Sequence, residues 1–479
     1  MQVPESVLGL DLIVGGMGID ISSVELVAEV ARHPSGRCSG NLSVTALSEV
    51  YARLLQTGDP GGEIRAAFDA FNQVVPSLAP EVDALYRRYH IPGGKDPSAP
   101  FTGPALGGST PSREVQLLFV TSAFAHVWRV KRAAPGRPVG INFLRKVERP
   151  LLYGLYGVML AGVDWVVMGA GDPGEVPGWM DLLARHEPAE LPLHVATVPH
   201  GAYKIRFAPR ELTRAQLPPL RRPPFFAIIS SHLQAAALHS DPKTRPDGFV
   251  VEGSDAGGHN APPREKRRDE RGDYVYGPED VADLDAVAAI GLPFWIAGGW
   301  GHPEKLKSAQ GRWRPHLQVG TLFALAAESA MEPTVRRRVL DLVWHRDLEV
   351  VSHATASPST YPFKVALVPG TLGDPAVYEA RERICNIGHL RGWRPNGSNP
   401  VGLCPADAEN CFIRAGGAPW RTRGSMCLCN SLLATRGLGQ PGEPAVVTLG
   451  DITSVRSLQS KLKRMDYSAR EAVDFLLDG

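Results

Sequence analysis

Residues Gly248 to Asn260 read GFVVEGSDAGGHN, and this stretch decides the fold. An apolar run of strand length leads directly into two glycines and a histidine, which is how a rigid scaffold presents one ionisable group to a ligand. Three other segments are also apolar runs that end in glycine: LIVGGMG (Leu12–Gly18), FWIAGG (Phe294–Gly299) and LQVGT (Leu317–Thr321). This repetition is typical of parallel strands that end around one anionic ligand.

Eight strand-like runs alternate with helical patterns, such as Leu233–Leu238 and Asp280–Ala289, over residues 1–338. Strands that alternate with helices form a parallel sheet, and eight of them close a barrel. The sequence therefore predicts an α/β fold, a TIM-type (β/α)8 barrel. The eight predicted strands are Leu12–Gly15, Arg37–Leu42, Val139–Phe143, Trp165–Gly169, Phe225–Ser230, Gly248–Glu252, Phe294–Ala297 and His316–Val319.

Two stretches are longer than a barrel connection needs and are interpreted as insertions. Residues 44–138 contain helical patterns at Leu47–Leu55 and Gly62–Val74, and this insertion could form a lid. Residues 191–223 contain two alternating runs, Leu193–Val198 and Tyr203–Phe207, which predict a hairpin. Either insertion could cover the catalytic face of the barrel, and the sequence does not distinguish between them.

Residues 339–479 are expected to form a C-terminal region that packs on the barrel. This region holds five of the six cysteines. A zinc or iron–sulfur site built from Cys385, Cys404, Cys427 and Cys429 is one alternative, and packing of these cysteines as small hydrophobic side chains is the other. Because Cys427-Leu428-Cys429 lacks the usual CxxC spacing, packing is favoured and no metal is predicted.

The composition indicates a large protein with no preference for polyanions. The 479 residues are 43% hydrophobic, and 51 Lys and Arg balance 50 Asp and Glu. The balance disfavours nucleic acids and membrane surfaces as partners. The first residues lack the features of a signal peptide, and the most apolar stretch, Leu151–Met168, contains glycines and Asp164. A cytoplasmic protein without a membrane span is expected.

The four glycine-ended segments, in this order, resemble the nitronate monooxygenase family, formerly called 2-nitropropane dioxygenases. They also resemble its relatives, the FMN-dependent enoyl-acyl-carrier-protein reductases. The resemblance extends over Leu12–Glu328. It implies a flavoprotein, an FMN-binding barrel that acts as an oxidoreductase. Two activities follow as alternatives: oxidation of a nitronate or related carbon acid by O2, which is favoured, and reduction of an enoyl thioester with NAD(P)H as a transient reductant. A non-catalytic flavin-binding scaffold is a third alternative.

The expected cofactor site lies at the ends of the strands. An FMN phosphate needs backbone N–H donors, and in barrels these usually follow strands seven and eight. The resemblance further implies contacts of the flavin ring with the Gly16 segment, of its polar edge with Asn142, and of the phosphate or ribityl chain with Gln318. The full expected set is Gly16, Met17, Gly18, Asn142, Gly257, Gly258, Gly298, Gly299, Gln318, Gly320 and Thr321.

His259 is the expected catalytic residue, because the resemblance implies an acid or base role for the histidine of Ala-Gly-Gly-His. An imidazole that titrates near neutral pH can remove a proton beside a nitro group or protonate an enolate. In this chain Asp255 replaces the commoner glutamate of the motif, which leaves the helper residues open. Ser230 and Ser231 are expected to form hydrogen bonds to the substrate. The remaining acid or base candidates, which have no matching motif, are His194, His200 and His232.

The expected substrate is a small molecule, and a thioester of coenzyme A or of a carrier protein is one alternative. The charged run REKRRDERGD (Arg264–Asp273) follows the histidine and would lie at the mouth of the barrel. Its basic residues could contact a phosphate-bearing substrate, or the run could simply be solvated.

Overall fold

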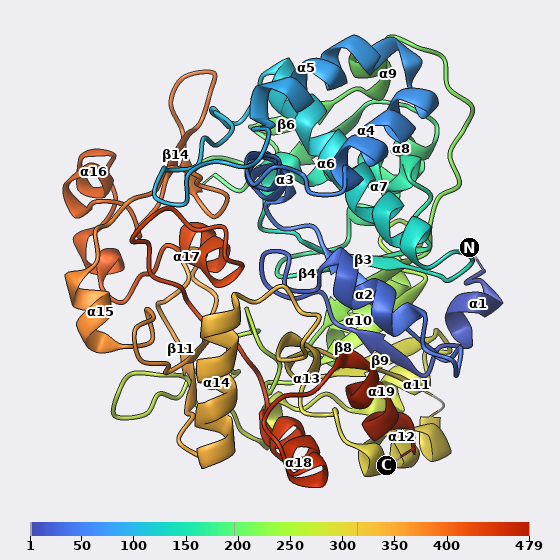
Figure 1. Ribbon diagram of the computed structural model, residues 1–479, viewed down its shortest axis with the longest axis vertical. Helices are drawn as coiled ribbons and strands as arrows, with labels where there is room; N and C mark the ends of the chain where they lie inside the picture. Colours follow the sequence, from blue (N-terminus) through green and yellow to red (C-terminus); the bar gives the residue numbers. More distant parts are fainter. Residues whose placement is uncertain (1, 196, 314, 479) are drawn as a thin grey trace.

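The structure, a computed structural model, describes residues 2–195, 197–313 and 315–478. Eight parallel strands close into a barrel, which confirms the predicted (β/α)8 architecture (Figure 1). Each expected strand forms within a residue or two of its predicted bounds. In the order of pairing around the barrel, the strands are β1 (Leu12–Val14), β10 (His316–Val319), β9 (Phe294–Ala297), β8 (Gly248–Glu252), β7 (Phe225–Ile229), β4 (Trp165–Gly169), β3 (Gly140–Leu144) and β2 (Cys38–Ser43).

Aromatic side chains fill the inside of the barrel. The ring of Phe226 stacks on Trp295 at 3.9 Å between centroids, and Trp165 lies 5.9 Å from Trp295. Val3 and Val7 pack on the same cluster, and Val7 belongs to helix α1 (Glu5–Leu8), which precedes β1. The N-terminal end of the barrel is therefore closed by packed side chains, and ligands have access only from the carboxyl ends of the strands.

Helices cover the outside of the barrel. Of the two helical patterns predicted between strands, the first forms α10 (His232–Ser240), but the second forms only α11 (Leu284–Ala288). The prediction of a helix from Asp280 to Ala289 is too long because the side chain of Asp283 accepts a hydrogen bond from the N–H of Ala286 and begins the helix there. The other helices that follow barrel strands are α2 (Val24–Ala31), α7 (Glu148–Leu160), α8 (Val176–Ala184), α12 (Pro303–Trp313) and α13 (Thr321–Ala324).

The insertion at residues 44–138 is helical. Its helices gather with α7 and α8 at one end of the molecule (Figure 1). The longest is α6 (Arg113–Ala133), which buries His126 and packs along α7. No helix among the described residues is long and apolar enough to cross a membrane. The remaining helices of this insertion are α3 (Leu47–Gln56), α4 (Glu63–Val74), η1 (Pro76–Leu78) and α5 (Ala79–Tyr89).

The second insertion contains a two-stranded antiparallel hairpin, β5 (Ala189–Pro192) and β6 (Lys204–Phe207), followed by α9 (Pro209–Thr213). This first strand lies wholly before the expected run Leu193–Val198, whose described residues form no strand. The reason is local packing, since Ala189 and Leu191 are buried and the indole of Trp179 donates to the carbonyl oxygen of Glu190. Ala196, within the expected run, lies outside the described residues.

Residue 339, the predicted start of the C-terminal region, lies inside α14 (Pro333–His345) and not between two elements. The last helix, α19 (Ala469–Asp478), contacts α2 and α12 on the outside of the barrel (Figure 1). The region thus returns to the barrel after leaving it. Its other elements are β11 (Val350–His353), β12 (Phe363–Ala366), α15 (Pro375–Ala380), β13 (Gly392–Arg394), β14 (Val401–Leu403), α16 (Glu409–Arg414), η3 (Pro419–Thr422), α17 (Leu428–Thr435) and α18 (Thr453–Leu462).

The cysteines of this region are free thiols. Cys385, Cys404 and the partly buried Cys427 pack together in a small cluster, whereas Cys429 belongs to the main core. Within the part of the chain that the structure describes, no three side chains of His, Cys, Asp or Glu are arranged to hold a metal ion.

Packing around Gly248 gives a first prediction. A Cβ atom at Gly248 would lie 2.4 Å from Cε1 of Phe226 and 2.6 Å from the carbonyl oxygen of Pro293. Because Gly248→Ala forces the stacked rings apart, we expect it to lower the free energy of unfolding by about 1–3 kcal/mol. Gly178→Ala in α8 is the control, because no atom lies within 4 Å of its Cβ position. Chemical denaturation of both variants measures the difference, and equal loss in the two would contradict this account.

Candidate active site

A cavity of about 220 Å³ lies at the carboxyl ends of the barrel strands. The loops after β1, β3, β8, β9 and β10 converge on it. This arrangement brings together all the residues that the sequence analysis named for the cofactor, together with the expected catalytic histidine. These lining residues are Gly16, Met17, Gly18, Asn142, Gly257, Gly258, His259, Gly298, Gly299, Gln318, Gly320 and Thr321.

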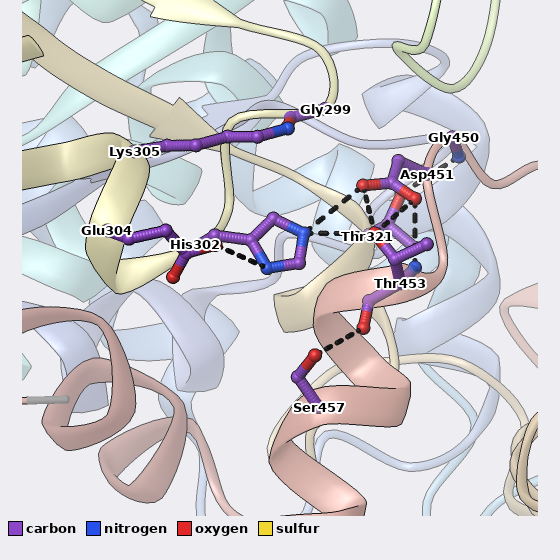
Figure 2. Close-up of polar contacts among 9 residues, drawn as sticks. All are labelled: Gly299, His302, Glu304, Lys305, Thr321, Gly450, Asp451, Thr453 and Ser457. Atoms are coloured by element: carbon purple, nitrogen blue, oxygen red, sulfur yellow. Dashed lines mark hydrogen bonds and ion pairs between the residues drawn. The ribbon is translucent and has the colours of Figure 1, made fainter. Parts of the chain in front are cut away.

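The loops after β9 and β10 present unused backbone donors at the cavity wall. Gly298 and Gly299 have φ angles of +80° and +72°, which other residues rarely adopt. Among the described residues, no protein acceptor receives a hydrogen bond from the N–H of Gly299, Trp300 or Thr321. The ammonium group of Lys305 donates to the carbonyl oxygen of Gly299 and holds this loop (Figure 2). Converging N–H groups of this kind form a concavity that suits an anion.

Asp451 borders the same end of the cavity, and its negative charge is already matched by protein donors. The hydroxyl and the backbone N–H of Thr453 both donate to its carboxylate, and Nε2 of His302 lies 3.4 Å from it (Figure 2). Burial alone would raise the pKa of Asp451, but these hydrogen bonds outweigh burial and lower it. The carboxylate is therefore ionised and held toward His302.

The C-terminal region supplies a wall of the cavity that the sequence analysis did not assign. Its segment 446–451 lies against the loop that carries the Ala-Gly-Gly-His motif. The N–H of Gly450 donates to Oγ1 of Thr321 at 2.8 Å (Figure 2). The N–H of Asp451 donates to the carbonyl oxygen of Asp255 at 2.9 Å. The N–H of Gly258 donates to Oγ1 of Thr448 at 2.8 Å. Part of the hydrogen-bonding capacity of Thr321, expected for a phosphate, is thus used by the protein itself.

A second part of the C-terminal region holds the other side of the catalytic loop. The N–H of Lys364, in β12, donates to the carbonyl oxygen of Gly258 at 2.9 Å, and the N–H of Asn260 donates to Pro362 at 3.1 Å. The insertion at residues 44–138 contributes only Thr45 to the cavity lining among the described residues. The C-terminal region contributes Phe363, His389, Leu390, Leu428, Cys429, Leu432, Thr435, Thr448, Leu449, Asp451 and Ser454.

A buried ion pair ties the helical insertion to this wall. Nε2 of His389 lies 3.1 Å from the carboxylate of Glu49 in α3, and both side chains are almost fully buried. Burial would raise the pKa of Glu49, but the charge and hydrogen bond of His389 and the hydroxyl of Ser48 lower it overall. Breaking one side of such a pair leaves an unmatched buried charge, so the pair fixes the position of His389 at the cavity.

His259 differs from its expected behaviour. Its Nε2 atom lies 2.7 Å from Oγ of Ser357, and its ring meets Phe363 edge-on at 5.0 Å between centroids. Burial, together with the positive charge of Lys146, lowers the pKa of His259 to about 4. This differs from the expected titration near neutral pH, because the partly buried ring is surrounded by residues such as Ser357 and Phe363 that the sequence does not place beside it. The imidazole is neutral at pH 7.

Two side-chain amides at the cavity are held by the barrel interior. The Nδ2 group of Asn142 donates to the carbonyl oxygen of Gly16 at 3.3 Å, while its buried Oδ1 atom has no partner among the described residues. Oε1 of Gln318 accepts from Nδ2 of Asn41 at 2.9 Å, and Oδ1 of Asn41 accepts from the indole of Trp165 at 2.6 Å. The unpaired oxygen of Asn142 is an unused acceptor, which a ligand that donates a hydrogen bond would satisfy.

The two serines expected to contact the substrate do not line this cavity. Ser230 and Ser231 line a smaller neighbouring pocket of about 50 Å³. The hydroxyl of Ser231 accepts from the N–H of Leu233 at 3.1 Å and caps α10, which explains why it is turned away. Among the histidine candidates, Nδ1 of His232 accepts from the N–H of Asp283, and the other two, exposed on the hairpin loop, are His194 and His200.

The charged run at residues 264–273 is mostly exposed, and much of its charge is paired on the surface. Arg267 lies 2.7 Å from Glu279, and Arg271 lies 2.7 Å from Glu349. Contact of this run with a phosphate-bearing substrate stays a prediction.

No protein-family model matches this chain, and no curated protein matches it. Three solved structures of related architecture are FabK from Thermotoga maritima, a nitroalkane oxidase from Streptomyces ansochromogenes and the enoyl reductase domain of MlnA from the macrolactin biosynthesis cluster of Bacillus amyloliquefaciens. They share 13%, 12% and 11% of residues with this chain, with TM-scores of 0.46, 0.44 and 0.47. The alignments cover 100%, 98% and 100% of this chain and 96%, 95% and 97% of those chains. The barrel itself is established by the strand pairing of this chain.

The contact of Gly450 with the catalytic loop gives a second prediction. A Cβ atom at Gly450 would lie 2.2 Å from the carbonyl oxygen of Asp255. We therefore expect Gly450→Ala to displace segment 446–451 and to expose the N–H of Gly258, which Thr448 now protects. Hydrogen exchange at residues 255–259 should become at least tenfold faster. Gly311→Ala in α12, where nothing lies within 4 Å, is the control. Unchanged exchange in Gly450→Ala would show that this contact does not secure the loop.

Proposed function

We propose that this protein is an FMN-dependent oxidoreductase that oxidises a nitronate or a related carbon acid with O2. One observation carries the proposal: the free N–H groups of Gly299, Trp300 and Thr321 face the same cavity as the neutral imidazole of His259. The three N–H groups suit a phosphate, and the imidazole can exchange a proton with a substrate. The motif resemblance of the sequence adds to this argument.

The residues present fit FMN. The glycines after β9 and β10 leave room for a phosphate at the free N–H groups, and the unpaired Oδ1 of Asn142 would accept from an N–H of the flavin. The amide of Gln318, held by Asn41, is available to the ribityl chain. When bound, FMN would supply two-electron chemistry and reaction with O2.

His259 is placed to exchange a proton with the substrate. When its Nε2–H donates to Ser357, the lone pair lies on Nδ1, and the hydroxyl fixes the ring. A base with a pKa of about 4 removes a carbon-bound proton slowly, so a substrate that arrives as an anion suits this site. An anionic nitronate beside the ring would also raise the pKa of His259 and strengthen its hydrogen bond.

A second candidate function is the NAD(P)H-dependent reduction of an enoyl thioester. The apolar part of the wall supplied by the C-terminal region favours it, because Leu390, Leu428 and Leu432 would accommodate an acyl chain. An anaerobic titration separates the two functions. Bleaching of the flavin by a nitronate supports oxidation, and bleaching by NADPH followed by recovery with an enoyl thioester supports reduction.

Cofactor binding gives a third prediction. We expect the purified protein to be yellow and to contain about one non-covalent FMN per chain. Gly299→Val should abolish this binding, because a side chain there meets Asp255 within 3.1 Å and is strained at a φ of +72°. Gly108→Val is the control, on an exposed loop with nothing within 4 Å. Flavin absorbance after gel filtration measures the outcome. A wild-type protein that cannot be reconstituted with FMN would contradict the proposal.

Proton transfer at His259 gives a fourth prediction. His259→Asn should leave flavin absorbance and Tm nearly unchanged but reduce turnover of a neutral carbon acid by roughly 10²–10⁴-fold. A preformed nitronate has already lost its proton, so the variant should turn it over much faster. With the neutral substrate, wild-type kcat/KM should rise with pH as the imidazole loses its proton near pH 4. His200→Asn is the control. Full activity of His259→Asn on the neutral substrate would show that the role of this residue is structural and not catalytic.

A further inference from the structure

Glu252 occupies a position between two cavities. It is the last residue of β8, and its register partner is Ala297 of β9. Among the described residues, it is the only one that lines both the central cavity and the small pocket beside Ser230 and Ser231. Its carboxyl group forms no hydrogen bond or ion pair with the described part of the protein. A carboxyl group without a protein partner in a shared wall is available to ligand and water.

The small pocket is suited to water. Its volume is about 50 Å³, and a water molecule needs roughly 10–15 Å³ of such space together with two to four polar partners. Its polar lining residues include Ser230, Tyr276 and Asn260. The Oδ1 atom of Asn260 is buried and has no partner among the described residues. Water in this pocket would lie beside the carboxyl group of Glu252.

Ionisable groups surround Glu252 on both sides. Arg264, Tyr276 and Asp280 line the small pocket, while Asp255 and His259 line the central cavity. Burial raises the pKa of Glu252 to about 8 and lowers that of His259 to about 4. At pH 7 the carboxyl group therefore carries a proton, and the imidazole does not. Two groups whose pKa values are pushed apart in one cavity can serve as an acid and a base.

We propose that Glu252 carries protons between the central cavity and the small pocket. Its carboxylic acid gives a proton to an anionic atom of the ligand in the central cavity and becomes a carboxylate. The carboxylate then takes a proton back from water in the small pocket, and the hydroxide equivalent leaves to solvent. The role in turnover rests on the proposed function, because an oxidoreductase must move protons together with electrons. The protonation of Glu252 itself does not depend on the cofactor.

The first test uses the protein without substrate. Infrared difference spectra recorded across pH 5–9.5 should show a protonated carboxylic acid that disappears as the pH rises through about 8. This signal should be absent in Glu252→Gln and unchanged in Glu190→Gln, an exposed glutamate that pairs with Lys204. Loss of the signal in Glu252→Gln alone supports the proposal. A wild-type spectrum in which no carboxyl group titrates above pH 6 overturns it.

The stability of the fold provides a second readout. The pKa of Glu252 is higher in the folded chain than the ordinary value of 4.5, so its contribution to stability is present below pH 4.5 and is lost as the pH rises through about 8. Glu252→Gln should therefore raise Tm relative to the wild type at pH 8.5 and leave it similar at pH 5. An equal difference in Tm at both pH values would contradict a neutral carboxyl group in the fold.

The third test measures turnover with whichever substrate proves active. Glu252→Gln should lower kcat at least tenfold with little change in KM, and it should lose the decline in rate that the wild type shows above pH 8. Glu252→Asp should restore part of the rate. If the rate of Glu252→Gln still declines above pH 8 as in the wild type, proton transfer by this residue is overturned, while the proposed function stays intact. If the protein binds no flavin, the proposed function fails, and the infrared and Tm tests still decide whether Glu252 is protonated.

Discussion

The candidate site depends on a contact between two backbone segments that lie almost two hundred residues apart. The loop Asp255–His259 follows β8, and segment 446–451 lies directly on it. The N–H of Asp451 donates to the carbonyl oxygen of Asp255, and the N–H of Gly258 donates to the hydroxyl of Thr448. Gly257 and Gly450 permit this approach, since a Cβ on either would meet the main chain of the other segment. This contact positions the loop that carries His259 and supplies part of the wall of the cavity.

Another part of the C-terminal region affects the electrostatic character of the site, because Ser357 and Phe363 contact the ring of His259. Burial lowers the pKa of His259 and raises the pKa of Glu252, since desolvation disfavours the charged form of each. The imidazole becomes a weaker base and the carboxyl group a weaker acid. The pKa of Asp451 is lowered despite burial, because Thr453 and His302 donate hydrogen bonds to its carboxylate. The chemistry available to the cavity is therefore set by what covers it as much as by the barrel beneath.

Much of this arrangement was predictable from the sequence. Four apolar runs that end in glycine, together with four further strand-like runs, identified all eight strands. Several of these runs are continuously hydrophobic because parallel strands are buried on both faces. The residues named for the site meet in one cavity because the carboxyl ends of barrel strands converge. The wall from segment 446–451 was not predictable, since it is made of main-chain contacts that leave only Gly450 as a signal. The low pKa of His259 was likewise not predictable from the sequence, because it depends on burial by Phe363 and other residues distant in the sequence.

The position of segment 446–451 has a consequence for the order in which the molecule matures. A growing chain leaves the ribosome from its N-terminus, and the eight strands of the barrel are all synthesised before residue 320. The loop with His259 then stays exposed to water while more than one hundred further residues are synthesised. Until the segment with Gly450 has been synthesised, the loop lacks its hydrogen bonds to Thr448 and Asp451, and the cavity lacks the part of its wall that this segment supplies. The nascent barrel can therefore be folded and still chemically immature, and the last part of the chain to be made determines when the site comes into existence.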